Sequence, residues 1–139
     1  MVQSDAAERR LLQGAVALAC LVPLGIGTLG VIEGPSVLRG VAAVPPDLDS
    51  HFRYLSGLLL GIGLGFASCI PAIERRGARF RLLGAIVVAG GLARVLSLAA
   101  VGVPGQGHVF GLVMELGVVP LMMLWQARVA RRCEQPRPL

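Results

Sequence analysis

The sequence contains no lysine, and it is poor in aromatic and charged side chains. Aromatic residues make up 4% of its 139 residues and charged residues 15%, whereas a soluble domain usually carries about 25% charged residues. Hydrophobic residues account for 55%, the mean hydropathy is +0.74, and the apolar blocks are continuous rather than alternating. So short a chain cannot bury this many apolar side chains in one small core. The composition therefore excludes a soluble domain, disfavours strands and indicates a membrane protein.

Motifs of common cofactor and catalytic sites are also missing. The sequence has no P-loop, dinucleotide fingerprint, nucleophile elbow or haem-attachment motif. Its two histidines, His51 and His108, lack the HxxH or HxxxH spacing of metal ligands. Cys20 and Cys69 lie inside apolar blocks and Cys133 near the C-terminus, which does not suit a disulfide framework. We expect no cofactor and no metal.

Four apolar blocks are long enough to cross a bilayer. About 20 helical residues, at roughly 1.5 Å rise per residue, span a hydrocarbon core of about 30 Å. The blocks predict an all-α fold, a four-transmembrane-helix bundle, in one membrane domain over residues 11–132. The predicted helices run over about 11–32, 51–73, 82–103 and 108–126. Residues 1–10 are expected to form a cytoplasmic N-terminal segment and residues 133–139 a disordered tail.

The distribution of arginine predicts the orientation. Ten of the 13 basic residues flank one side of the predicted helices: Arg9, Arg10, Arg75, Arg76, Arg79, Arg81, Arg128, Arg131, Arg132 and Arg137. The positive-inside rule places this side, and with it both termini, in the cytoplasm. The same pattern accounts for the +5 net charge, so we expect the lipid bilayer as a partner and no nucleic acid. Arginine without lysine is typical of GC-rich bacterial genes, and we predict a multi-pass protein of the bacterial plasma (inner) membrane.

Two ionisable residues are predicted to meet inside the bundle. Arg94 lies near the middle of the third predicted helix and Glu115 well inside the fourth. A charged side chain at mid-membrane costs about 2.5–3.5 kcal/mol on insertion scales, so it normally faces inward and has a partner. The short turn at residues 104–107 makes these helices antiparallel neighbours, and the two residues differ in depth by roughly 3 Å. We predict an Arg94–Glu115 ion pair, with a structural role in helix register as the alternative to a functional one.

Further polar side chains gather in the outer half of the predicted bundle. They indicate a polar cavity that opens to the outer face, with Glu115 or Glu33 as catalytic general acid or base. The expected substrate-binding residues are Arg94, Arg53, His51, Tyr54, Ser97, His108 and Phe110. Alternatively, Arg53 and Tyr54 anchor a helix at the lipid headgroups, and the two histidines lie at the membrane interface without a functional role.

Gly57, Gly61 and Gly65 follow one another at four-residue spacing in the second predicted helix. This small-xxx-small pattern lets two helix backbones approach closely. We therefore expect this face to pack against a neighbouring helix or to form a homo-oligomer. Arg53 lies four residues before Gly57, so we expect it to share the face and to point into the bundle near its outer mouth.

Parts of the sequence resemble a known family. The stretch HFRYLSG at residues 51–57, which opens a Gly-rich helix up to Gly65, the stretch GLARVLS at residues 91–97, and Glu115 carry the resemblance. They resemble a family of small bacterial four-helix membrane proteins known only as a domain of unknown function. In helix count alone, the chain is also similar to the DoxX-like group. The resemblance implies a bacterial inner-membrane protein, and it carries over no activity and no catalytic residue.

Three functions fit these features. The first is an enzyme that uses acid–base chemistry on a lipophilic, terpenoid-like small molecule, as an isomerase or a cyclase. The scarcity of aromatic side chains argues against it, because carbocation intermediates usually need aromatic walls. The second is a non-catalytic membrane binding protein or a subunit of a membrane complex. The third is a small multidrug transporter-like protein, which is disfavoured because the first predicted helix has no acid before Glu33 at its end.

Overall fold

The computed structural model describes the backbone of residues 2–38, 41 and 43–134, and the side chains of these residues except 2–5 and 134. Within this described part there is no strand, and four helices are long and apolar enough to cross a membrane. The predicted all-α class with four candidate spans is therefore confirmed. The orientation of the termini stays a prediction.

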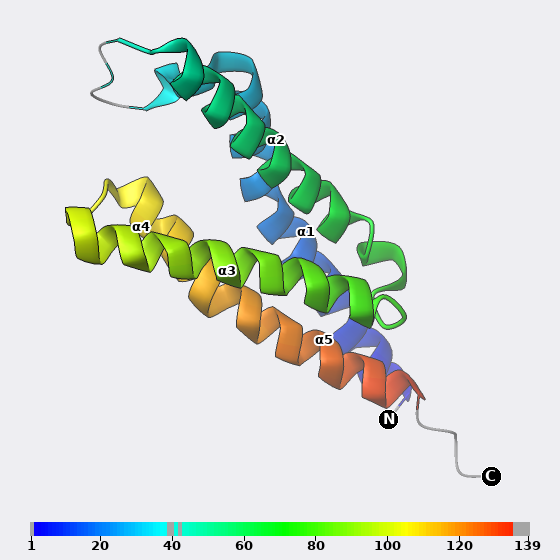
Figure 1. Ribbon diagram of the computed structural model, residues 1–139. Helices are drawn as coiled ribbons and strands as arrows, with labels where there is room; N and C mark the ends of the chain where they lie inside the picture. The colour runs from blue at the N-terminus through cyan, green and yellow to red at the C-terminus, as the bar shows by residue number, and fades with distance from the viewer. Residues whose placement is uncertain (1, 39–40, 42, 135–139) are drawn as a thin grey trace. The chain divides into compact units, whose positions relative to one another are not determined.

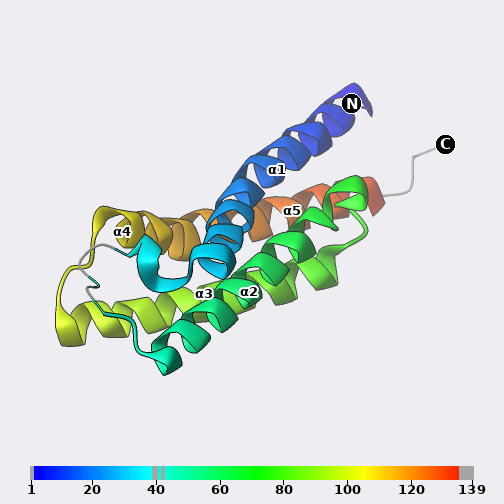
Figure 2. The ribbon, with the colours of Figure 1, turned by 90° about the horizontal axis from the view of Figure 1, so that it is seen from above.

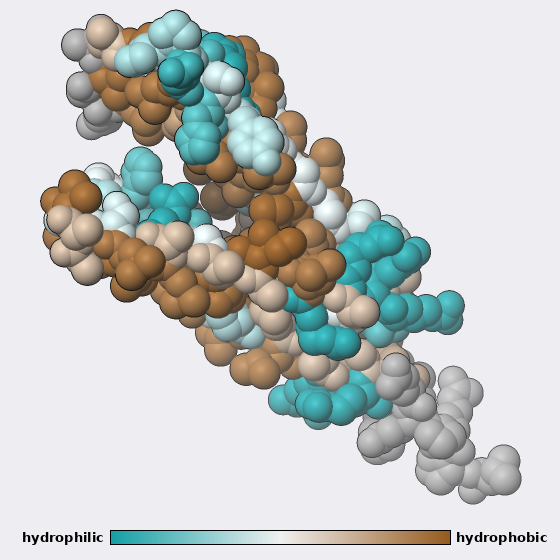
Figure 3. Space-filling model, viewed as in Figure 1, coloured by the Kyte–Doolittle hydropathy of each residue, from teal (hydrophilic) through white to brown (hydrophobic). Residues whose placement is uncertain are grey.

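The candidate spans present an apolar surface that suits lipid. They are Ala6–Val37, Pro46–Ala72, Gly77–Val101 and Gln106–Cys133. Large apolar side chains on them are widely exposed, as at Leu18 (69%), Leu96 (72%) and Leu121 (66%). Figure 3 shows hydrophobic surface along α3 (Gly77–Val101), with hydrophilic surface gathered near the end where this helix begins. Because exposed apolar surface of this extent is stable in lipid and unfavourable in water, the chain is a multi-pass membrane protein.

Contacts divide the chain into two compact units, each described by itself. One is Gly14–Ile70, which we call the α1–α2 unit. The other combines the chain up to Gln13 with the chain from Pro71 onward, and we call it the α3–α5 unit.

Close backbone contacts between α1 (Val2–Glu33) and α2 (Pro46–Ala67) hold the α1–α2 unit together. A Cβ at Gly27 would lie 2.8 Å from the backbone nitrogen of Leu60, and one at Gly63 would lie 3.2 Å from Pro23. These glycines therefore let the two helices approach more closely than any larger residue would allow. A short 3₁₀ helix, η1 (Gly34–Val37), follows α1, and another, η2 (Ile70–Ala72), follows α2.

Both helices begin earlier in the chain than the apolar blocks do. The α1 helix already begins at Val2, within the segment 1–10 expected to precede the membrane domain. The α2 helix begins at Pro46 rather than near residue 51. Proline suits the first helical turn because its missing N–H has no intrahelical partner there, and the acids Asp47 and Asp49 favour the positive end of the helix dipole.

The glycine ridge of α2 is not the face that packs on α1. Gly57 and Gly61 are exposed, and a Cβ at either would meet nothing within 4 Å. The face that meets α1 instead carries Ser56 and Gly63, both buried. Gly57 and Gly61 therefore do not pack against α1, where the small residues in close contact are Gly27 and Gly63. Packing of the Gly57, Gly61 and Gly65 face in a homo-oligomer stays a prediction.

The α3–α5 unit is built on an antiparallel pair of long helices. α3 reverses at Gly102, whose φ of 108° is readily adopted by glycine, and leads to α4 (Gln106–Val113). A π-helical segment, η3 (Met114–Val118), and α5 (Val119–Glu134) follow. Figure 2 shows α4, η3 and α5 running on as one helical rod, and α3 packs along all three (Figure 1).

This last rod extends beyond the predicted 108–126 in both directions. It begins at Gln106 and continues through Glu134, so Cys133 lies on the helix rather than in a tail. Residues 135–139 lie outside the described residues. Residues after Gln126 also pair with the start of the chain: Arg128 Nε and Arg132 Nη1 lie 3.2 and 2.5 Å from the Glu8 carboxylate oxygens.

Candidate functional site

Arg94 on α3 and Glu115 in η3 form the ion pair that the sequence predicts. Nε of Arg94 lies 3.0 Å from each carboxylate oxygen of Glu115 and donates a hydrogen bond to Oε1. The other oxygen, Oε2, is buried, and within the described part of the chain no donor has hydrogen-bond geometry toward it. The Glu115 side chain is 19% exposed and the Arg94 side chain 42%. The ion pair thus leaves one carboxylate oxygen without a hydrogen bond.

Two glycines lie beside the Arg94–Glu115 pair. A Cβ at Gly91, one turn before Arg94, would lie 2.7 Å from Cδ2 of Leu116 and 3.0 Å from Cβ of Glu115. A Cβ at Gly111, one turn before Glu115, would lie 3.8 Å from Oε1 of Glu115 and 4.0 Å from Cζ of Arg94. Gly91 therefore lets the two helices come together, whereas a methyl group at position 111 would make only ordinary van der Waals contact with the charged groups.

The π-helical segment η3 places Glu115 in a wider turn than an α-helix provides. The N–H of Val119 donates to the carbonyl oxygen of Met114, five residues back. The cause lies one residue further on, at Pro120, which has no N–H and whose ring would clash with the Leu116 carbonyl in a regular α-helix. Single π-helical turns of this kind are frequent at functional sites.

The guanidinium group of Arg94 retains free donors. Arginine carries five N–H groups, and the contact with Glu115 uses the one on Nε. Among the residues that the structure describes, none accepts a hydrogen bond from Nη1 or Nη2 of Arg94. Because this side chain sits on an apolar span, these donors are available to a polar or anionic group of a lipophilic molecule.

Arg53 makes a different set of contacts, all within the α1–α2 unit. Its Nε lies 2.8 Å from Oδ2 of Asp49, and its Nη1 donates to the carbonyl oxygens of Val31 (2.5 Å) and Ile32 (2.8 Å). These carbonyls belong to the last turn of α1, where no N–H of the helix can reach them. Gly34, at a φ of 61°, ends the helix beside this guanidinium group. Arg53 thus caps α1 and ties it to α2.

The remaining predicted site residues divide between the two units. Glu33, His51 and Tyr54 are exposed in the α1–α2 unit. Ser97, His108 and Phe110 are exposed in the α3–α5 unit, and no hydrogen bond joins them to Arg94 or Glu115. Of the predicted set, the structure brings Arg94 and Glu115 together, and the roles of the other residues stay predictions.

Three features of the α3–α5 unit escaped the sequence analysis. The first is the π-helical turn, for which Pro120 in an apolar block was the available signal. The second is the fully buried Gln126, whose Nε2 donates to the Ile73 carbonyl oxygen at 2.9 Å. The third is a cavity of about 400 Å³ at the start of α3, whose lining includes Arg81 and Arg131. Within the described residues, no group of three or more His, Cys, Asp or Glu side chains is placed to hold a metal ion.

Comparison with known proteins gives a family but no function. The family model described as Domain of unknown function (DUF4345) matches residues 11–126. No curated protein and no solved structure matches the chain. The chain therefore belongs to the DUF4345 family, which confirms the resemblance to a domain of unknown function. The likeness to the DoxX-like group and the bacterial source stay predictions.

Proposed function

We propose that this member of the DUF4345 family is a membrane-embedded isomerase that moves a proton within a lipophilic, terpenoid-like small molecule. One observation carries the proposal. Glu115, on a membrane-spanning helix, is held by Arg94 through a single N–H, while its Oε2 has no hydrogen bond among the described residues. A buried polar atom without a hydrogen bond is costly, and such atoms in a native structure call for an explanation. The explanation we propose is that Oε2 is kept free to accept a proton from a C–H group of the substrate.

The ion pair determines the direction of the first proton transfer. A carboxylate paired with arginine is ionised, so it accepts a proton and cannot donate one at the start of the reaction. Glu115 would take the proton from a carbon next to a substrate carbonyl group, and the C–H electrons would move to the carbonyl oxygen. The free Nη1 and Nη2 groups of Arg94 would stabilise the resulting enolate. If the substrate has a carbon–carbon double bond next to the carbon that loses the proton, this enolate is conjugated with it. Returning the proton to the far carbon of that double bond re-forms the carbonyl group and moves the double bond into conjugation with it, which is an isomerisation without a net change in charge.

A first step in which Glu115 accepts a proton favours an isomerase over a cyclase. Cyclisation of an alkene or epoxide begins with a proton from an acid, which an ionised Glu115 does not hold. The aromatic content of 4% also provides few of the aromatic walls that carbocations need. Glu33, exposed at the end of α1, is the alternative base. Ser97, His108 and Phe110 are proposed to contact the part of the substrate that does not react.

The test follows deuterium uptake by geranylacetone, a terpenoid ketone, in deuterated buffer with the protein in lipid nanodiscs. The wild-type protein should accelerate exchange at the carbons next to the carbonyl group. Glu115→Gln should slow this exchange by about 100-fold or more, because the amide cannot accept the proton. Glu33→Gln is the matched variant and should exchange as the wild type does. Equal exchange in the wild type and Glu115→Gln contradicts the proposal, and loss in Glu33→Gln alone moves the base to Glu33.

A second candidate function is that of a non-catalytic subunit, either of a homo-oligomer or of a larger membrane complex. The exposed Gly57 and Gly61 favour it, because they leave a smooth strip of α2 to which another helix could pack. The protein's mass in lipid nanodiscs tests this assembly. The wild type should form a dimer or larger oligomer that Gly57→Leu/Gly61→Leu breaks, whereas Gly14→Leu/Gly25→Leu, at open glycines of α1, should not. A monomeric wild type contradicts the homo-oligomer.

A further inference from the structure

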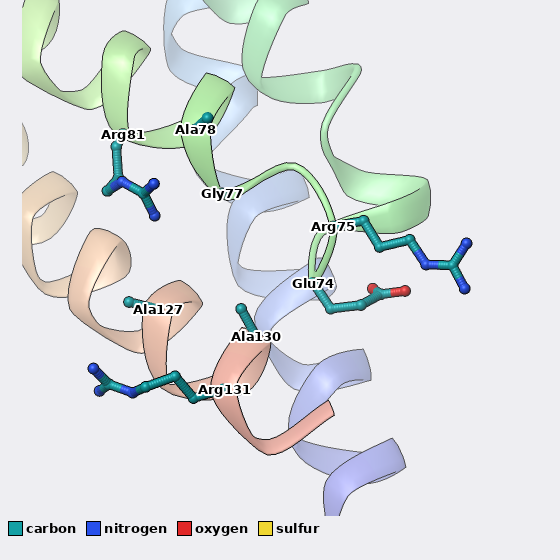
Figure 4. Close-up of a pocket in the computed structure, with 8 residues that line it drawn as sticks. All are labelled: Glu74, Arg75, Gly77, Ala78, Arg81, Ala127, Ala130 and Arg131. Carbon is teal, nitrogen blue, oxygen red and sulfur yellow. The ribbon is translucent and has the colours of Figure 1, made fainter. Parts of the chain in front are cut away.

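The cavity at the start of α3 is separate from the Arg94–Glu115 pair and is lined by charged and very small residues. Its volume is about 400 Å³, and its lining consists of Glu74, Arg75, Gly77, Ala78, Arg81, Ala127, Ala130 and Arg131. The space exists because four of the lining residues, Gly77, Ala78, Ala127 and Ala130, have at most a methyl side chain. The charged side chains stand around this space rather than filling it (Figure 4).

Two described acids of this region, Glu74 and Glu8, are already paired with other arginines. Glu74 lies 3.5 Å from Nη1 of Arg9, and both oxygens of Glu8 contact Arg128 and Arg132. Within the described side chains, no carboxylate pairs with Arg75, Arg81 or Arg131. Among the side chains that the structure describes, the cavity therefore has a surplus of positive charge without a neutralising carboxylate.

Two of these arginines are placed to act together. Figure 4 shows the guanidinium groups of Arg81, from α3, and Arg131, from α5, on the same side of the cavity. The side chains of Arg75 and Glu74 extend away on the other side. The first turn of α3 also begins at Gly77, and the N-cap residue Arg76 makes no side-chain capping hydrogen bond. The N–H groups of this turn add to the attraction for an anion.

The position of the cavity along the spans points to lipid as the source of the anion. Gly77 is the first residue of one candidate span, and Arg131 lies in the last turn of another that ends at Cys133. These helix ends lie at the level of lipid headgroups, on the side that the arginine distribution predicts to be cytoplasmic. Basic pockets between membrane helices on that side bind anionic headgroups. We propose that Arg81 and Arg131 bind the phosphate group of an anionic membrane phospholipid in this cavity.

Native mass spectrometry of the detergent-solubilised protein tests the proposal, with dioleoyl phosphatidylglycerol as the probe and dioleoyl phosphatidylcholine as the uncharged-headgroup comparison. The wild type should retain phosphatidylglycerol in preference to phosphatidylcholine. Arg81→Gln/Arg131→Gln should weaken retention roughly 25-fold, since each arginine contributes about fivefold. The matched control is Arg10→Gln/Arg76→Gln, which removes the same charge outside the cavity lining and should retain the lipid.

Three outcomes overturn the proposal: equal retention by the two double variants, equal retention of both lipids, and displacement of phosphatidylglycerol by inorganic phosphate at equal concentration. The last would identify the site as one for free phosphate. Arg81→Lys/Arg131→Lys provides a second measurement if the glutamine variant fails to fold. Lysine keeps the charge but cannot form the bidentate hydrogen bonds that arginine makes with a phosphate group. Binding should therefore fall several-fold, and unchanged binding also overturns the two-arginine site.

Discussion

Gly91 on α3 lies so close to Leu116 in the π-helical turn that a Cβ at position 91 would be 2.7 Å from Cδ2 of Leu116. The same Cβ would be 3.0 Å from Cβ of Glu115, which is fixed to the backbone. We therefore predict that Gly91→Ala forces α3 and η3 apart and lowers the free energy of unfolding by about 1–3 kcal/mol. Thermal unfolding in detergent measures this change.

Gly90, the preceding residue, provides the control for that substitution. A Cβ at Gly90 would meet nothing within 4 Å. Gly90→Ala should therefore stabilise the helix by about 0.5–1 kcal/mol, because alanine has less backbone freedom to lose. If Gly91→Ala and Gly90→Ala shift the unfolding midpoint in the same direction, α3 does not pack against η3 at Gly91 as closely as the structure shows.

Arg53→Gln should destabilise the protein by about 1–3 kcal/mol, because it removes the charged donor that caps the carbonyls of Val31 and Ile32. The stability of Arg53→Lys should fall between those of this variant and the wild type. An ammonium group keeps the charge but lacks the planar guanidinium geometry that lets one side chain donate to several acceptors. Unfolding midpoints compare the variants with Arg10→Gln, which changes an exposed arginine. A midpoint for Arg53→Gln equal to that of Arg10→Gln would mean that Arg53 does not hold α1 to α2.

Cys133 reports the orientation of the C-terminus. It is exposed near the end of α5, whereas Cys20 and Cys69 are buried. If the C-terminus is cytoplasmic, a membrane-impermeant maleimide should label Cys133 in inverted vesicles and leave it unlabelled in spheroplasts. Cys133→Ala, which keeps the buried cysteines, should remain unlabelled in both preparations. Labelling of the wild type in spheroplasts would reverse the predicted topology.

The sequence predicts the spans and the Arg94–Glu115 pair because both follow from the cost of exposing groups to the wrong solvent. Apolar blocks must lie in lipid, and a lone charge in lipid must find a partner. A tight turn between two spans then limits the partner of Arg94 to residues at its own depth in the next helix. No other detail of side-chain packing was needed to predict that contact.

Other features depend on packing that periodicity does not encode. The regular spacing of Gly57 and Gly61 indicated a packing face, yet α1 meets α2 at the less regular Gly27 and Gly63. Which glycine is used depends on the shape of the partner helix, and one helix alone does not contain that information. The π-helical turn likewise depends on how the chain relieves the clash at Pro120, and a kink would have relieved it as well.

The charge state of Glu115 in a lipid bilayer tests the central claim most directly. Infrared difference spectra between the wild type and Glu115→Gln, recorded in nanodiscs, show whether this side chain is a carboxylate or a protonated carboxyl group. We predict a carboxylate band for Glu115 in the wild type and a protonated carboxyl band in Arg94→Gln, because the arginine holds the negative charge within the apolar span. A protonated Glu115 in the wild type, or a carboxylate that survives Arg94→Gln, would contradict the ion pair and the base that depends on it.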